Sequence, residues 1–181
     1  MNKMLIVDIE TTGFLNAGGL ICEVGIVELD LSNGDKKIIY NELVKEDGFN
    51  ESHSNSWIFS NSDLKFSDVA EAKPLDKQAI QNILDTYPVT AYNKKFDFGF
   101  LRNRGINISK ELCCPMLKMT GICKIPSRSR YGGYKWPSVE ESWKHLFPEI
   151  AYDEKHRGGD DALHEAMICH ELHKIVGNLE E

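Results

Sequence analysis

The sequence predicts an α/β or α+β domain built around one mixed sheet. Three observations indicate this fold class: a buried strand opens the chain, an antiparallel meander follows it, and a further apolar strand then alternates with amphipathic helices. The chain has 181 residues, of which 41% are hydrophobic and 27% charged. This composition predicts one domain over residues 1–181, large enough to bury an ordinary core.

The predicted meander occupies the first quarter of the chain. Residues 4–8 are apolar up to Asp8, and residues 21–29, "ICEVGIVEL", alternate and are rich in β-branched side chains, so each predicts a strand. The turn "SNGD" at 32–35 leads into a third strand at 37–43. Residues 46–63 are rich in Ser and Asn and predict a long loop or lid.

Four segments carry apolar residues at helical spacing. We predict helices at 75–87, 96–104, 138–147 and 160–176, with a short buried strand at 89–92. A Pro or a Gly directly follows each of these helices, as expected where a helix ends. The helix at 138–147 begins with the S-x-x-E pattern of a capping box.

Charge and cysteine content exclude several classes of protein. A net charge of -7 argues against a protein that coats nucleic acid without specificity. No apolar run is long enough to span a membrane, and no signal peptide is evident. Five cysteines, an odd number, argue against a disulfide framework and favour a reduced, cytoplasmic setting.

Two carboxylates follow the first strand, in the stretch "LIVDIETTGF" at 5–14. Asp8 and Glu10 are two residues apart, and residues at this spacing in a strand point to the same face. Like charges held this close are unfavourable unless a cation lies between them. The alternative is a strand end exposed to solvent.

Two further segments place acidic side chains at the starts of predicted helices. Asp97 follows the short strand at 89–92, and Asp161 lies five residues after His156 at the start of the last helix. Helix dipoles and N-caps explain single carboxylates at such places. Together, however, the four carboxylates favour Mg²⁺ or Mn²⁺, and two such ions with a histidine base suit phosphodiester hydrolysis.

Three segments resemble the exonuclease motifs of the DEDD superfamily: "DIETTG" at 8–13, "YNKKFD" at 92–97 and "HRGGDDA" at 156–162. The H-x-x-x-x-D form of the third resembles the DEDDh branch, which includes the proofreading exonuclease subunit of bacterial DNA polymerase III, RNase T and oligoribonuclease. The sister branch carries a tyrosine four residues before the last aspartate, where this chain has Arg157.

The resemblance implies a ribonuclease H-like α/β fold, with a central mixed five-stranded sheet flanked by helices. It implies a 3′–5′ exonuclease, a hydrolase that removes nucleoside monophosphates with two divalent metal ions, Mg²⁺ or Mn²⁺. His156 would be the general base, and Asp8 would bridge both ions. The implied metal ligands are Asp8, Glu10, Asp97 and Asp161.

The same resemblance implies several substrate contacts. Thr11, Thr12 and Gly13 match the loop that approaches the terminal nucleotide, Phe14 matches an apolar wedge, and Asn93 matches a residue near the substrate backbone. The chain departs from the family where Gly158 and Gly159 replace a common Ala-Leu pair, which predicts a loosened loop behind His156. No role is predicted for Tyr92, and His53 and Trp57 in the loop at 46–63 are expected to face solvent.

Residues 112–139 contain no acidic side chain and five cations. Arg128 and Arg130 stand among aromatic residues, a composition that suits the binding of single strands. Charge alone equally allows a solvated basic loop, and Trp136 could instead pack on the helix at 138–147.

We therefore expect an exonuclease that acts on 3′ ends, with single-stranded DNA favoured over RNA. The alternatives are an exoribonuclease of the oligoribonuclease or RNase T type, and a non-catalytic module that binds nucleic-acid ends. No membrane partner is expected, whereas a polymerase and a second copy of the chain stay open as partners.

Overall fold

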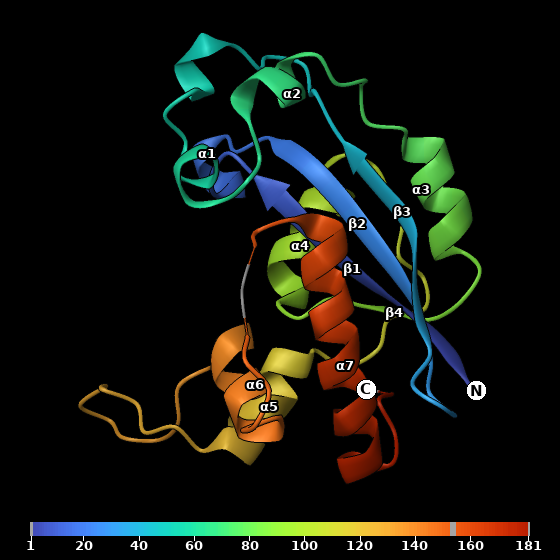
Figure 1. Ribbon diagram of the computed structural model, residues 1–181, viewed down its shortest axis with the longest axis vertical. Coiled ribbons are helices and arrows are strands. Elements are labelled where there is room, and N and C mark those ends of the chain that lie inside the picture. Colours follow the sequence, from blue (N-terminus) through green and yellow to red (C-terminus); the bar gives the residue numbers. More distant parts are fainter. Residues whose placement is uncertain (1, 153–154, 181) are drawn as a thin grey trace.

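A mixed sheet of four strands forms the centre of the computed structural model, which describes residues 2–152 and 155–180 (Figure 1). The strands are β1 (Lys3–Thr11), β2 (Ile21–Asp30), β3 (Lys36–Leu43) and β4 (Val89–Thr90). Their order is β3-β2-β1-β4, with β1 and β2 antiparallel, β2 and β3 antiparallel, and β1 and β4 parallel. The predicted α/β class and the meander are confirmed.

The expected fifth strand is wrong for the residues that the structure describes. The chain after α4 does return beside β4, where the Val89 N–H donates to the Lys110 carbonyl at 2.8 Å and the Thr90 hydroxyl donates to the Cys113 carbonyl at 2.8 Å. This pairing amounts to a single bridge between Val89 and Glu111. Pro115 then starts a helix, so the segment ends before it can form a strand.

Helices pack on both faces of the sheet. The side chains of β1 point alternately to one face and to the other, so they contribute to a separate core on each face. Leu5, Val7 and Ile9 face a core shared with α3 (Lys77–Leu84) and α4 (Lys94–Asn103). Met4 and Ile6 face the opposite core, which contains residues of α5 (Pro115–Cys123), α6 (Val139–Leu146) and α7 (Gly158–Val176). Asp8 and Glu10 continue this second series, so they lie on the face that α7 covers.

The four helices predicted from apolar spacing are all present, with ends shifted by a few residues. The capping box of α6 is confirmed, since the Ser138 hydroxyl accepts from Glu141 N at 3.1 Å and the Glu141 carboxylate accepts from Ser138 N at 2.9 Å. α5 was not predicted, because the basic segment around it was interpreted as a loop. No helix among the described residues is both long and apolar enough to cross a membrane.

The segment predicted as a long loop or lid folds into short helices instead. These are η2 (Glu51–His53), α1 (Trp57–Asn61) and α2 (Phe66–Ala70), which lie together at one end of the molecule (Figure 1). They are held by a small core of their own, made of Cys22, Phe49, Ile58, Leu64 and Val69. This core fixes α1 against the end of the sheet.

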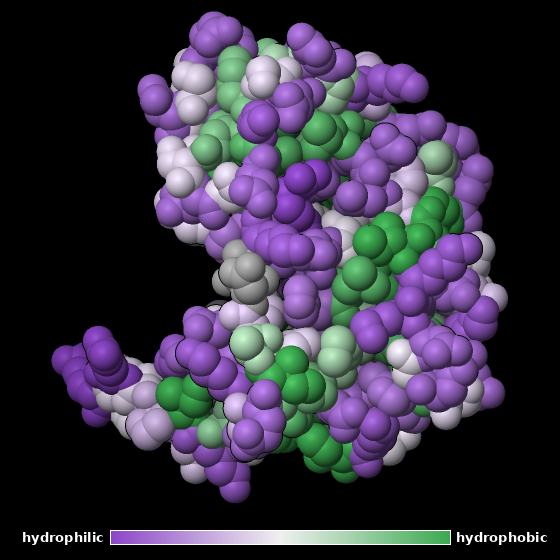
Figure 2. Space-filling model, in the orientation of Figure 1, coloured by the Kyte–Doolittle hydropathy of each residue, from purple (hydrophilic) through white to green (hydrophobic). Residues whose placement is uncertain are grey.

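A hairpin-like arm, residues 124–136, projects from the body between α5 and α6 (Figure 1). Ser127 N donates to the Gly133 carbonyl at 2.9 Å, and Pro126 pairs with Tyr134. Gly132 and Gly133 form its tip with φ of 70° and 85°, a conformation that side chains disfavour. The molecule is hollowed between this arm and the end that carries α1 and α2 (Figure 2).

Candidate active site

Asp8 and Glu10 mark the end of β1 and begin the site. The strand runs in register with β2 up to Glu10, opposite Glu23, and the register shifts between Glu10 and Thr11. The shift turns the chain out of the sheet at the point where the two carboxylates meet α7. The prediction that Asp8 and Glu10 share one face is confirmed by the register.

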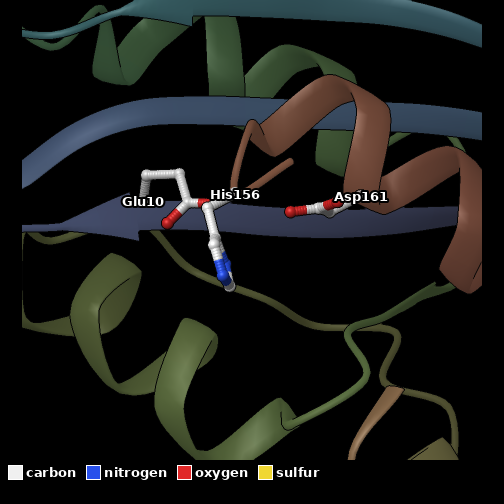
Figure 3. Close-up of side chains that lie close together, drawn as sticks. All are labelled: Glu10, His156 and Asp161. Carbon is white, nitrogen blue, oxygen red and sulfur yellow. The ribbon is translucent and has the colours of Figure 1, made fainter. Parts of the chain in front are cut away.

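Glu10, His156 and Asp161 form the tightest group in the site. One side-chain oxygen or nitrogen of each lies within 4.8 Å of the others, and His156 lies between the two carboxylates in Figure 3. They come from β1, from the loop before α7 and from the first turn of α7. His156 has a φ of 51°, a left-handed conformation that is uncommon for residues other than glycine.

Asp8 and Asp97 complete the acidic group. Burial raises the pKa of Asp97 to about 7, although hydrogen bonds from its own backbone N–H and from that of Ile9 oppose the rise. Burial also raises the pKa of Asp8 well above its usual value, and the charges of Glu165, Glu10, Asp97 and Asp161 raise it further. The four predicted ligands therefore lie near enough to repel one another, as two like charges do in a shared site.

The donor set fits a hard divalent cation. The Asp161 Oδ1 atom is buried and accepts no hydrogen bond from any described residue, while Oδ2 accepts from Arg157 N at 3.1 Å. Burial raises the pKa of Asp161, and the adjacent His156 lowers it. A buried carboxylate oxygen without a donor, among other carboxylates and with no thiolate in the group, is the environment that Mg²⁺ or Mn²⁺ would satisfy.

Glu165 is a fifth carboxylate that the sequence reasoning missed. It lies one helical turn after Asp161, on the same face of α7, and it is buried. Its Oε2 atom accepts from Tyr92 N at 3.3 Å. Burial and the charge of Asp97 raise its pKa well above the usual value. The spacing of four residues from Asp161 was the available signal, but it is common in helices.

The loop that carries His156 is anchored by a buried ion pair. The Arg157 Nε and Nη2 atoms each lie 2.9 Å from a different carboxylate oxygen of Glu23, which is buried on β2. Gly158 N also donates to Glu23, at 3.1 Å. Neither member of the pair was predicted to have a role, because 134 residues separate them.

Gly158 and Gly159 do not loosen the loop, so that prediction was wrong. Both are buried in the first turn of α7. A Cβ on Gly158 would lie 2.9 Å from Gly25 N, and a Cβ on Gly159 would lie 2.7 Å from the Asn41 side chain. The glycines therefore allow the helix to approach β2 and β3 closely. The Asn41 side chain then accepts from Gly159 N at 3.0 Å.

Trp57 is exposed, as expected of a residue that faces solvent, but it also reaches the site. Its ring contacts that of His156 edge to face, with centroids 4.8 Å apart. It also lines a pocket of about 490 Å³ together with Ile9, Glu10, Ile58 and Phe96, although 60% of the residue is exposed. We call this the first pocket. His53 instead stacks on Phe49, with centroids 5.4 Å apart.

The predicted substrate contacts divide into three groups. Thr11, Thr12, Gly13 and Phe14 all line the first pocket, beside Glu10. Asn93 lines a neighbouring pocket, which Phe14 shares. Arg128 and Arg130 lie exposed on the arm and line neither pocket.

Tyr92, to which no role was assigned, connects the site to the arm. Its hydroxyl lies 2.5 Å from the Ser142 hydroxyl and within 2.9 Å and 3.1 Å of the carbonyls of Ser138 and Pro137. The base of the arm is therefore tied to the segment that carries Asp97.

The chain matches no family model and no curated protein sequence. Its fold, however, is similar to those of several solved nucleases. The nuclease domain of 3′hExo, a DEDDh member solved with bound rAMP, superposes with a TM-score of 0.67 at 14% identity, over 99% of this chain and 95% of that domain.

Two longer proteins share the fold. Cell-death related nuclease 4 (CRN-4) matches with a TM-score of 0.65 at 13% identity, over 97% of this chain and 65% of its own. E. coli Exonuclease I, solved with a dT13 oligonucleotide, matches with a TM-score of 0.70 at 12% identity, over 96% of this chain and 41% of its own. The chain thus spans less than two thirds of these two proteins.

Proposed function

We propose that this protein is a 3′–5′ exonuclease that removes nucleoside monophosphates from single-stranded ends. The observation that carries the proposal is the convergence of Glu10, His156 and Asp161 within 4.8 Å, from the two ends of the chain. Asp8 lies close enough to this group that, besides burial, the charges of Glu10 and Asp161 raise its pKa, as does the charge of Asp97. The likeness of the fold to that of the nuclease domain of 3′hExo, a DEDDh family member, supports the proposal.

In this proposal the four carboxylates hold two divalent ions, Mg²⁺ or Mn²⁺. When bound, such ions would activate water and stabilise the leaving oxygen of the phosphodiester. His156 would accept the proton of the attacking water, and the carboxylates of Glu10 and Asp161 would stabilise the positive charge that it gains. The fixed backbone of His156 would keep the ring in place for this transfer.

The first pocket is proposed to receive the terminal nucleotide. Thr11, Thr12 and Gly13 bring main-chain groups to its edge, and the apolar faces of Phe14 and Trp57 suit a base. Arg128 and Arg130 would contact phosphates further along the strand. Similar folds were solved with a dT13 oligonucleotide and with rAMP, which is consistent with either polymer. We keep single-stranded DNA as the favoured substrate and RNA as the competing one, and the panel below compares them.

A substrate panel tests the proposal. Short single-stranded DNA, the same sequence as RNA, and a duplex with a mismatched 3′ end would carry a 5′ label and be incubated with Mg²⁺, Mn²⁺ or EDTA. We expect a ladder that shortens from the 3′ end, needs the metal and is strongest for single strands. Tight binding without cleavage on every substrate would refute the enzyme and favour a binding module.

A further inference from the structure

Arg104, which directly follows the last residue of α4, forms a two-point ion pair with Glu46. Its Nε atom lies 2.8 Å from the Oε1 atom of the carboxylate, and its Nη2 atom lies 2.6 Å from the Oε2 atom. Each of the two side chains is only 11% exposed. Charges at this depth are costly unless their remaining hydrogen-bonding atoms also find partners.

Both residues find these further partners in the loop between β1 and β2. The Arg104 Nη2 atom also donates to the carbonyl of Gly19 at 3.0 Å. The Glu46 Oε2 atom accepts from Ile21 N at 2.7 Å. The ion pair therefore holds the main chain at the point where the loop at 12–20 enters β2.

The end of this loop is in turn fixed to its beginning. Thr12 N donates to the Leu20 carbonyl at 2.9 Å, and Leu20 N donates to the Thr12 hydroxyl at 2.9 Å. Gly19 N donates to the Phe14 carbonyl at 3.0 Å, and a Cβ on Gly19 would collide with the carbonyl of Gly13. Thr12, Gly13 and Phe14 line the first pocket. A shift of Gly19 would therefore move the edge of that pocket.

The same guanidinium reaches the Phe14 side chain through two aromatic rings. It lies over the ring of Phe100, 5.0 Å from the centroid. The rings of Phe100 and Phe96 have centroids 5.1 Å apart, and Phe96 meets Phe14 edge to face with centroids 6.3 Å apart. Arg104 thus supports the loop directly at its main chain and indirectly at its most exposed ring.

We infer that Arg104 is a positioning residue for the terminal nucleotide, because its planar guanidinium joins Glu46 to Gly19 and so fixes the loop that receives that nucleotide. This inference rests on the proposed function and adds to it a determinant of affinity outside the segments that resemble the exonuclease motifs. Asp8 and Glu10 are held by the register of β1 with β2, so the metal ligands should survive loss of the ion pair.

Binding of a nucleoside monophosphate, with Ca²⁺ in place of Mg²⁺, tests this role apart from turnover. Arg104→Met removes the guanidinium. Arg104→Lys keeps the charge but lacks the planar fork that contacts the carboxylate and the carbonyl together. The matched control is Arg102→Met, which removes a more exposed ion pair with Glu111 from the same helix.

We expect both variants of Arg104 to bind the monophosphate about tenfold more weakly than wild type, since the loop is no longer held in its receiving shape. The control should bind it as wild type does. In hydrolysis of single-stranded DNA, the same two variants should raise KM about tenfold and keep kcat within about threefold of wild type, as expected when binding alone is lost.

A merely structural role would damage the whole site, so Mn²⁺ affinity and urea unfolding are measured for every variant. Mn²⁺ affinity should stay at the wild-type value in the variants of Arg104. If Arg104→Met does not fold, Arg104→Lys decides. Wild-type affinity for the monophosphate in Arg104→Lys, a parallel loss of Mn²⁺ affinity, or an equal loss in the control would each overturn the inference and leave the exonuclease intact. A wild-type protein that neither binds the monophosphate nor cleaves DNA would overturn the proposed function as well.

Discussion

Arg157 joins the loop before α7 to the middle of the sheet through a two-point ion pair with Glu23, with both contacts at 2.9 Å. Glu23 is buried, whereas the Arg157 side chain is one-third exposed. Arg157 directly follows His156 in the chain, so the ion pair holds the chain next to the left-handed backbone of His156. In the free protein, the position of the proposed base thus depends on a residue of β2.

Breaking this ion pair should lower activity by more than the accompanying loss of folding stability explains. Arg157→Met leaves Glu23 with one hydrogen bond, from Gly158 N, and should reduce the free energy of unfolding by about 2 kcal/mol. Because His156 would then be held less firmly, we expect kcat to fall about 10- to 100-fold with little change in KM. Steady-state kinetics and urea unfolding measure the two effects.

The matched control is Lys3→Met, which removes the more exposed pair between Lys3 of β1 and Glu28 of β2, the strand that also carries Glu23. This variant should change stability by less than about 1 kcal/mol and leave kcat at the wild-type value. A kcat for Arg157→Met equal to that of the control would show that the pair supports the fold only.

The carboxylates of the site should be essential to hydrolysis but not to folding. Asp8→Ala and Asp161→Ala each remove an oxygen donor from the proposed metal site. We expect cleavage to drop below detection in both variants. The circular dichroism spectrum should not change, and the unfolding midpoint in EDTA should stay the same or rise, because a repelling charge is lost. Wild-type-like activity in either variant would refute the assignment.

Metal-free protein should lose stability as the pH rises. The folded pKa of Asp97, about 7, lies above the ordinary value of 3.8, so the folded state keeps a proton that the unfolded chain releases. The free energy of unfolding therefore falls as the pH rises from about 4 to about 7. Between pH 5.5 and 7.5 this one group accounts for about 2 kcal/mol.

Urea unfolding in EDTA at several pH values measures how steeply the free energy of unfolding falls with pH, which is the slope meant below. Asp97→Asn should flatten it, although Asp8, Asp161 and Glu165 act in the same direction. Added Mg²⁺ should restore stability at pH 7.5, because the cation replaces the lost protons and binds only the folded state. A wild-type slope that Asp97→Asn leaves unaltered would contradict the prediction.

Glu165→Gln should stabilise the metal-free protein. The amide oxygen can still accept from Tyr92 N, while a neutral amide replaces a buried carboxyl whose ionisation is disfavoured by burial and by the charge of Asp97. We expect a gain of about 1 kcal/mol in EDTA at pH 7.5, and a higher Mg²⁺ concentration for half-maximal activity, since the field that attracts the cation is weaker. Glu140→Gln on the exposed face of α6 serves as the control. Destabilisation by Glu165→Gln would indicate that the ionised carboxylate itself is needed.

Local patterns were sufficient to predict much of the fold and the motif residues. Asp8 and Glu10 share a face because strand geometry repeats every two residues. The capping box of Ser138 and Glu141 is contained in four residues and was found from them. Such features depend only on neighbours in the chain, so a single sequence is enough to reveal them.

Other features were not predictable because they depend on strand register and on packing between distant segments. The ion pair of Glu23 and Arg157, the contact of Trp57 with His156 and the burial of Glu165 have no local signal. The two glycines at the start of α7 are an example, because their role depends on how closely the helix approaches β2, which the sequence does not indicate.

The order of residues already indicates which side chains are available for chemistry at the end of β1, in α4 and at the start of α7. Their surroundings follow from packing in three dimensions, which adds a fifth buried carboxylate, an anchored histidine and two pockets on either side of Phe14. Ionisation, stacking and access to water depend on distances in space, and folding sets these distances between residues that lie far apart in the chain.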